Sequence, residues 1–479
     1  MTNSTSNPIN VTYVLIPKST SIICAGIPYN LVVTVNPKNT APTGTPIQPT
    51  CSASTGSIVL NGLPSTGTLV QKLGAVTTNY TITGGGTQDI TNLNPGNYTF
   101  AVSNGSCSST TLNITINNPP AVIKWNGTAW SGTPTINNKV EFNASYSSGS
   151  NANSPSNVDA CSCYITNNAV VTFNSGHTLK VVNEVQVVAG TLTFENDASL
   201  VQVNDLANNS GSINYKRYTK PVKRYDFTYW SSPVLGQTLK NLSPNTLGDK
   251  YYGFVNNAWV IYYNGAATMA SGNGYLIRAP QTFSITAAAI DTNPMFVGKP
   301  NNGVLSFSIA GNRAHLLGNP YPSAMDADTF LDANSAVLEG TLYFWTHNSP
   351  PSIAVAGDAK YNYTTNDYAT YNRTGGVGTA TAKTDSDTND PNDNNNLSIP
   401  TGKIAAGQGF FAPSTMAGGT VLFNNSMRIV GGASGVNNSQ FFKLSTTAKE
   451  STTTVATREK NRVWLNLTNK EGAFKQTLV

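Results

Sequence analysis

The sequence predicts an all-β protein that is divided into several domains. Only 11% of its 479 residues are charged, well below the quarter that is typical of soluble domains, and Asn, Thr, Ser and Gly take their place. Thr suits strands, while Asn and Gly tolerate the backbone angles of tight turns. Short apolar runs alternate with such turns along the chain, and signals for the start of a helix are nearly absent.

Residues 1–46 are predicted to contain two strands, Val11–Ile16 and Tyr29–Val35, followed by a linker rich in Pro and Thr. Two strands do not form a stable sheet alone, so this region is interpreted as the later part of a domain. Residues 47–120 predict an Ig-like sandwich, because short strands recur between turn residues. The strands expected there are Gly56–Leu60, Asn79–Thr83, Gly96–Val102 and Thr111–Ile116.

The cysteines favour an oxidising compartment over a zinc site. Cys51 and Cys107 bracket the sandwich and predict a disulfide that closes it, which would contribute about 4 kcal/mol. Cys161 and Cys163 share one face of a predicted strand. We favour buried small hydrophobic residues there, with a strained local disulfide as the alternative. Cys24 is left over.

Residues 121–224 predict a short β-solenoid, with an ordinary β-sandwich as the close alternative. Short apolar strands follow turns of Gly or Asn at regular intervals, and each such rung would bury what its neighbour cannot. A lone histidine, His177, is interpreted as a rung residue rather than a ligand. The expected rungs include Gly176–Val181, Gly190–Phe194, Ala198–Val203 and Gly211–Tyr215.

Residues 225–440 carry one pattern twice: a proline turn, an aromatic strand, and a Gly-x-Gly-aromatic strand closed by proline. A structural module is doubled more often than an active site, so we expect a jelly-roll-like sandwich of two related halves. The first copy comprises Tyr229–Val234, Lys250–Phe254 and Gly272–Pro280, and the second comprises Gly318–Ser323, Leu342–Trp345 and Gly407–Pro413.

Two further features flank the doubled pattern. Ser323–Leu338 is the one stretch that predicts a short helix or turn. Residues 441–479 predict the start of another β-domain, with a hairpin formed by Arg462–Leu467 and Ala473–Val479.

The second copy contains a long insertion that is rich in Asp and Asn. Its oxygen side chains alternate as in a calcium loop, although Asp390 stands where a turn glycine is expected. A solvated loop is favoured, calcium is the alternative, and no other cofactor is expected. The candidate calcium ligands are Asp385, Asp387, Asn389, Asp390 and Asp393.

Two candidate sites lie within 225–440. The aromatic run that includes Trp259, Tyr262 and Tyr263 suits stacking on sugar rings, although strands are rich in aromatic residues for packing reasons alone. Asp326 and Asp328 have the composition of a glycosidase carboxylate pair, but their position suits the start of a short helix better. No catalytic residue is predicted, and the protein is not expected to be an enzyme.

Charge and hydropathy exclude two classes of partner. The net charge of +5 comes largely from two short clusters, which suit solvated edges and not a nucleic-acid interface. No apolar run approaches the roughly 18 residues that cross a bilayer, so membrane insertion is not expected. The first eight residues lack the basic and apolar regions of a signal peptide.

Several motifs together resemble flavobacterial surface proteins that the type IX secretion system exports, in the group with a type C sorting signal. The resemblance covers roughly residues 121–479. Residues 51–118 are similar to repeats of gliding-associated adhesins, and residues 10–36 are similar to the end of a PKD-like repeat. The motifs that carry the likeness are Ala160–Cys163, Ala198–Gln202, Tyr225–Val234, Gly318–Asp328, Gly340–His347, Gly407–Phe411, Phe423–Arg428 and Arg462–Asn469.

The resemblance implies secretion through the outer-membrane type IX machinery and an extracellular place on the cell surface. It implies adhesion and supplies no catalytic residue. The chain is therefore expected to be a non-catalytic adhesin fragment without its signal peptide and sorting domain, serving as a stalk and attachment module. The alternative is a surface protein that binds or hydrolyses glycans at a site in residues 225–440.

Overall fold

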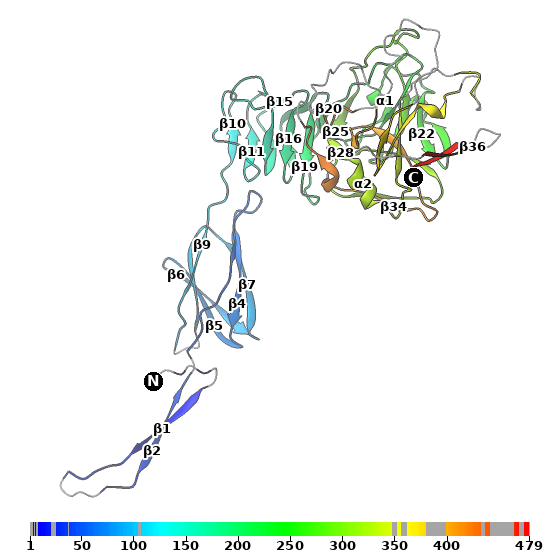
Figure 1. The fold of residues 1–479 in the computed structure, drawn as a ribbon. Helices are drawn as coiled ribbons and strands as arrows, with labels where there is room; N and C mark the ends of the chain where they lie inside the picture. The colour runs from blue at the N-terminus through cyan, green and yellow to red at the C-terminus, as the bar shows by residue number, and fades with distance from the viewer. Residues whose placement is uncertain are drawn as a thin grey trace, which may run out of the picture. The chain divides into compact units, whose positions relative to one another are not determined.

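A computed structural model describes residues 3, 5, 8–20, 25–36, 38–103, 107–346, 352–355, 362–379, 399–432, 436–440, 464–468 and 474–478. The chain divides into two compact units, Met1–Ala121 and Val122–Val479. Nearly all of the regular structure is β (Figure 1), which confirms the predicted fold class.

The first unit contains a hairpin and a two-sheet sandwich. In the hairpin, β1 (Ile9–Leu15) pairs antiparallel with β2 (Tyr29–Val35). The sandwich buries a core of aliphatic and aromatic side chains that includes Leu60, Leu69 and Phe100. Its sheets have the orders β3-β4-β7 and β6-β5-β8-β9, with β3 (Pro46–Ile47), β4 (Gly56–Leu63), β5 (Thr66–Leu73), β6 (Val76–Thr83), β7 (Gly86–Leu93), β8 (Gly96–Ser103) and β9 (Leu112–Ile116).

The second unit begins with a β-solenoid of about four turns. Its strands pair in parallel, turn upon turn, which decides against the alternative of a sandwich. One sheet holds β10 (Ile123–Trp125), β11 (Lys139–Phe142), β14 (Ser162–Ile165) and β17 (Val185–Val187), the second holds β12 (Tyr146–Ser147), β15 (Ala169–Phe173), β18 (Gly190–Phe194) and β20 (Ile213–Lys216), and the third holds β13 (Val158–Ala160), β16 (Thr178–Val181) and β19 (Ser199–Gln202).

Inward-facing side chains stack along the solenoid and explain its repeat. Phe173 lies over Phe194 with ring centroids 5.4 Å apart, and Phe194 lies 6.0 Å from Tyr215. Each of these rings is fully buried. Because equivalent residues of successive turns are in register, each turn covers the apolar face of the one before it.

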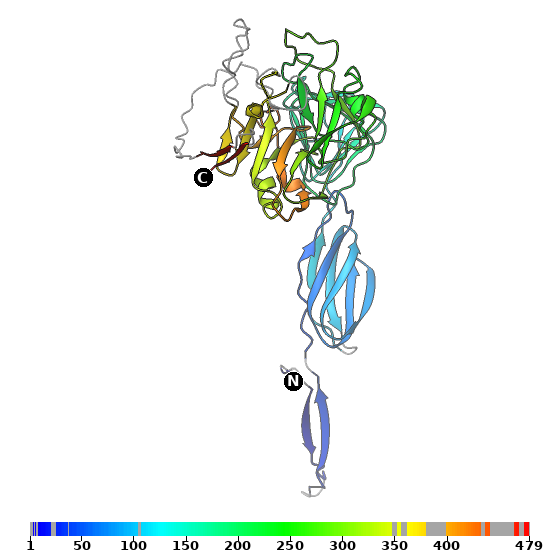
Figure 2. The same cartoon turned by 90° about the vertical axis from the view of Figure 1, so that its right-hand side faces the viewer.

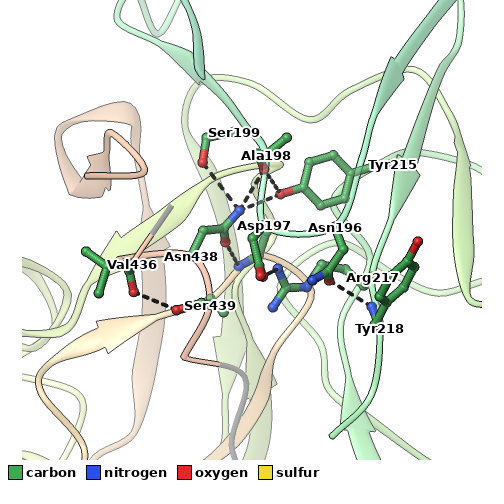
Figure 3. A network of polar contacts seen from close by, with 12 residues as sticks. Asn196, Asp197, Ala198, Ser199, Tyr215, Arg217, Tyr218, Val436, Asn438 and Ser439 are labelled. Atoms are coloured by element: carbon green, nitrogen blue, oxygen red, sulfur yellow. Dashed lines mark hydrogen bonds and ion pairs between the residues drawn. The ribbon is translucent and has the colours of Figure 1, made fainter. Parts of the chain in front are cut away.

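Residues after the doubled pattern fold back onto the last solenoid turns (Figure 3). The buried amide of Asn438 donates to the carbonyl of Ala198 and to the hydroxyl of Tyr215, at 2.7 and 2.8 Å. Nearby, the buried guanidinium of Arg428 donates to the carbonyl of Leu200 and to side-chain oxygens of Asn302 and others. A buried polar group is costly unless it is hydrogen-bonded, so these contacts fix the end of the solenoid.

The doubled sequence pattern forms the same arrangement of strands twice. The first copy has β21 (Phe227–Trp230), α1 (Leu239–Leu242), β22 (Tyr251–Val255), β23 (Ala258–Ile261), η1 (Tyr263–Gly265), β24 (Tyr275–Arg278) and β25 (Met295–Gly298). The second copy has β26 (Leu305–Ile309), β27 (Ala314–Gly318), β28 (Ala324–Asp326), α2 (Ala327–Ala333), β29 (Thr341–Trp345), η2 (Thr365–Asp367), β30 (Tyr368–Asn372), β31 (Gly375–Val377), β32 (Lys403–Ile404), β33 (Gly409–Pro413), β34 (Gly419–Phe423), η3 (Asn425–Met427) and β35 (Arg428–Ile429).

The two sheet orders correspond over four strands, and β31 is an additional edge strand of the second sheet. The first sheet runs β21-β24-β22-β23 and the second runs β27-β33-β29-β30-β31, and Figure 2 shows the green strands of the first copy and the yellow and orange strands of the second as separate sheets. Outside the main sheets, β25 of the first copy pairs antiparallel with β20 of the solenoid, and β26 pairs antiparallel with β34 within the second copy. Because β25 extends a solenoid sheet, that sheet continues across the expected boundary at 224/225.

The two copies meet through reciprocal backbone hydrogen bonds. The amide of Ser231 donates to the carbonyl of Gly407 at 2.8 Å, and the amide of Gly318 donates to the carbonyl of Gly272 at 3.0 Å. Residue 231 directly follows β21 at the position that corresponds to residue 318, the last of β27. Residues 272 and 407 likewise correspond to each other, ahead of β24 and β33. The junction is therefore close to two-fold symmetric, and we call it the seam.

Glycines allow the backbones to approach at the seam. A Cβ atom on Gly318 would lie 2.4 Å from the Cβ of Ser231, and one on Gly274 would lie 2.6 Å from the carbonyl oxygen of Leu317. Gly272 and Gly407 have φ of +83° and +73°, which other residues rarely adopt. Backbone geometry therefore accounts for both glycines of the first Gly-x-Gly and for Gly407 of the second.

Other predicted elements are also present. The helix expected within Ser323–Leu338 is α2, and the C-terminal hairpin is β36 (Trp464–Thr468) paired antiparallel with β37 (Phe474–Leu478). Both predictions are confirmed.

We predict that Gly318→Ala destabilises the protein by about 1–3 kcal/mol, because overpacking forces the backbone apart. In a Ser231→Gly background, the same substitution should cost at least about 1 kcal/mol less, since the clashing Cβ is gone. Ser231 is a suitable partner because its hydroxyl has no hydrogen bond to any described residue. Urea denaturation of the four proteins measures the coupling, and additive effects would contradict the proposed contact.

Candidate functional site

The space between the two main sheets is filled by an aromatic cluster. Its buried members are Tyr229 from the first sheet and Leu316, Trp345 and Phe411 from the second sheet. The opposite faces of the sheets pack on separate cores. Partly buried residues surround these four, namely Phe254, Leu276, Ala314, Tyr343, Tyr363 and Tyr368, and the ring of Trp259 contacts the cluster as well.

The cluster repeats the two-fold relation of the seam. Phe227 pairs with Arg278 in the first sheet, as Ala314 pairs with Pro413 in the second. Trp259 pairs with Phe254, as Tyr368 pairs with Trp345. The ring-centroid distances agree: 5.0 Å for Trp259–Phe254 and 5.1 Å for Tyr368–Trp345, then 6.4 Å for Trp259–Tyr252 and 6.4 Å for Tyr368–Tyr343.

The two copies differ at the position that Trp259 holds in the first copy and Tyr368 holds in the second. The hydroxyls of Tyr368 and Tyr229 are hydrogen-bonded at 2.5 Å, and burial raises the pKa of both phenols. Trp259, at the position of Tyr368, has 41% of its surface exposed. The cluster is therefore closed on one side and open on the other.

The structure separates the three predicted glycan-binding residues. Trp259 lies on the edge strand of the first sheet and contacts the aromatic cluster. Tyr262 packs against the core that the solenoid shares with this sheet, and the missing side chain of Gly253 makes room for its ring. Tyr263 belongs to η1 and is 68% exposed. These residues do not form a single patch.

A hairpin turn holds Trp259 in place. Asn256 and Asn257 both have positive φ, at 54° and 63°, as a type I′ hairpin requires. Their side-chain oxygens accept hydrogen bonds from Arg313 Nη1 at 2.9 Å and from the amide of Ala314 at 3.2 Å. The turn of the first copy is thus fixed to the second copy.

Asp326 caps a helix, as the sequence favoured. It precedes α2, and its carboxylate accepts a hydrogen bond from the amide of Thr329 at 2.9 Å. Burial alone would raise the pKa of Asp326, but hydrogen bonds from Lys403 and Thr329 outweigh it and lower the pKa. Asp328 accepts a hydrogen bond from the hydroxyl of Tyr371.

The remaining candidates have mixed outcomes. Cys163 is a fully buried free thiol, which agrees with a small hydrophobic residue and excludes a disulfide with Cys161. The disulfide between Cys51 and Cys107 stays a prediction. His177 bonds to the hydroxyl of Ser148 at 2.7 Å. The calcium candidates Asp385, Asp387, Asn389, Asp390 and Asp393 lie outside the described residues.

The sequence pattern missed most of the aromatic cluster. Tyr229, Trp345 and Phe411 all lie in the doubled segments, but their common location needs the pairing of sheets from two copies. Aligning the copies residue by residue would have brought them together. A dense local run of aromatic residues is a weaker signal for this cluster than the correspondence between the two copies.

A family model described as a domain of unknown function, DUF8693, matches residues 121–479. The chain belongs to this family. No curated protein matches the chain. The DUF8693 match begins one residue before the second compact unit, and it contains the solenoid, both copies of the sheet and the aromatic cluster.

The described residues contain neither a metal-binding cluster nor a helix that could span a membrane. Nowhere among the described residues do three or more His, Cys, Asp or Glu side chains come together in a way that could hold a metal ion. None of the described helices is both long and apolar enough to span a bilayer.

We predict that Asp326→Asn lowers the free energy of unfolding at neutral pH by about 0.5–1.5 kcal/mol, because the charge-assisted contact with Lys403 is lost while Asn still caps the helix. The folded pKa of Asp326 is lowered, so its contribution is present above the unfolded value of about 4 and is lost as the pH falls through the folded pKa. Thermal unfolding between pH 7 and pH 2.5 should therefore show the two proteins converging in acid. A constant difference across this range would contradict the lowered pKa.

Proposed function

We propose that the chain is a non-catalytic part of a secreted, cell-surface adhesin-like protein, serving as a stalk and attachment module. Its export is assigned to the type IX secretion machinery of the outer membrane, and its place is extracellular. The resemblance of residues 121–479 to type IX cargo supports the route. The modular all-β architecture supports the role of a stalk.

The observation that carries attachment is Trp259, an exposed indole held by a rigid set of rings. It contacts Phe254 at 5.0 Å and Phe411 at 5.9 Å, and its hairpin turn is fixed by Arg313. A large aromatic side chain loses little conformational entropy on binding when it is already immobilised. Exposed aromatic residues of this kind are frequent at recognition sites.

Glycans are the ligands that we propose for this module. Aromatic faces stack on the apolar faces of sugar rings, and amide side chains such as those of Asn256 and Asn257 are suitable partners for hydroxyl groups. We do not favour the alternative in which the protein hydrolyses glycans. The carboxylate of Asp326 caps a helix and pairs with Lys403, so these contacts already account for it.

We predict that beads coated with the chain are retained on immobilised polysaccharide without degrading it. The test uses surfaces of xylan, cellulose, laminarin and chitin, with beads coated in serum albumin as the control. Retention is counted under flow, and reducing ends are measured in the eluate. Failure to bind all four surfaces would contradict attachment to glycans, and release of reducing ends would contradict the absence of catalysis.

A further inference from the structure

The edge strand of the first sheet, β23, has backbone groups that no described residue uses. It pairs only with β22. The amide of Tyr262, directly after β23, donates to the carbonyl of Tyr251 in β22 at 2.8 Å, and the direction of the amides alternates along an antiparallel strand. The amides and carbonyls of Trp259 and Ile261 therefore point away from β22. None of them is hydrogen-bonded to a described residue.

The equivalent edge of the second sheet is covered by another strand. Since Trp259 corresponds to Tyr368, Ile261 corresponds to Thr370. β31 pairs antiparallel with β30 from Thr370 to Asn372 and is the last strand of the second sheet. The first sheet ends at β23, and no described strand corresponds to β31 there. The second sheet thus shows that this edge accepts an additional antiparallel strand.

β23 lacks the features that usually protect an edge strand. Natural edges carry charged residues, proline or a bulge. The residues of β23, Ala258–Ile261, include no charged residue and no proline, and their pairing with β22 is regular. Trp259 and Val260 have 41% and 40% of their surfaces exposed. An exposed, uncharged and apolar edge of this kind is a template for pairing with another chain.

We propose that β23 pairs with β23 of a second molecule of this chain, antiparallel and about a two-fold axis. When Val260 faces its equivalent in the second molecule, Trp259 of each molecule stands opposite Ile261 of the other. These are the residues whose amides and carbonyls point outwards, so each Trp259–Ile261 pair exchanges two hydrogen bonds. The first sheets of the two molecules then form one continuous sheet.

The side chains of β23 favour a second molecule over a strand of another protein. The register places the aromatic ring of Trp259 opposite the β-branched Ile261, and Val260 opposite Val260, and pairs of both kinds stabilise sheets. No like charges meet, because β23 is uncharged. A surface that is its own partner closes after two molecules, as in most symmetric dimers.

This inference goes beyond the proposed attachment to glycans and does not depend on it. The pairing uses backbone groups of β23, whereas attachment uses the ring of Trp259. Val260 projects from the opposite face of the strand, because successive side chains alternate between faces. Substitutions at Val260 therefore test the pairing while the ring of Trp259 stays in place.

Sedimentation velocity of the full chain, at concentrations up to about 0.5 mM, measures the association. Paired edge strands make a small interface, so we expect a weak dimer that is half formed at roughly 100 µM. Val260→Lys and Val260→Glu each bring like charges together across the two-fold axis, where facing Cα atoms are about 4.5 Å apart. Each should raise the dissociation constant at least tenfold, and an equimolar mixture of the two variants should restore association.

Two more variants complete the test. Ile261→Pro removes an outward amide that β22 does not use, so it should also weaken the dimer at least tenfold. Val170→Lys is the matched control, since Val170 is a 53% exposed valine within a solenoid sheet, and it should dimerise within twofold of the unaltered chain. Circular dichroism and the melting temperature establish that each variant is folded, and Ile261→Pro decides if the Val260 variants do not fold.

The remaining outcomes would overturn the proposal. An unaltered chain that is monomeric throughout the range would exclude the dimer. A dimer that is unchanged by Val260→Lys and by Ile261→Pro would form through another surface. A monomeric chain that binds an extended peptide of alternating Val and Thr would assign the edge of β23 to a strand of another protein.

Discussion

The close approach of two backbones at the seam is the constraint on which the second unit depends. Ser231 and Gly318 donate to carbonyls of the opposite copy, and these bonds form only where no side chain separates the strands. Glycine at 274 and 318 provides that space. Once the seam is closed, the facing sides of the two sheets must bury apolar surface, and the aromatic cluster supplies it. The same residues thus determine both the geometry of the sandwich and the position of Trp259.

Buried polar groups tie the duplicated sheets to the solenoid. Arg428 begins the last strand of the second copy and bonds to the carbonyl of Leu200 in the last solenoid turns. Asn438 comes after the second copy and bonds to Ala198 and Tyr215 there. Each of these side chains would be costly to leave unpaired. The open end of the solenoid is therefore completed by residues more than two hundred positions later, and the two parts share one core.

The sequence predicted the large-scale architecture because it depends on periodic patterns. The solenoid rungs and the doubled segments both repeat, and repeats predict repeated structure. The cap role of Asp326 was also predictable, since the signal is local. The assembly of the aromatic cluster was not, because Tyr229 and Phe411 are brought together by pairing between copies. Trp259 lies in a dense aromatic run of the sequence, and the same run contains Tyr262, whose partly buried ring packs against a core that the sequence does not reveal.

Amide hydrogen exchange at the seam tests this account most directly. The amides of Ser231 and Gly318 belong to different copies and are separated along the chain, but each donates to the other copy. If the seam is one cooperative contact, both amides should exchange with the same free energy of opening, close to that of global unfolding of the second unit. Exchange of Ser231 that is a hundredfold faster than that of Gly318 would show that the copies open independently, and would contradict the seam as the organising contact.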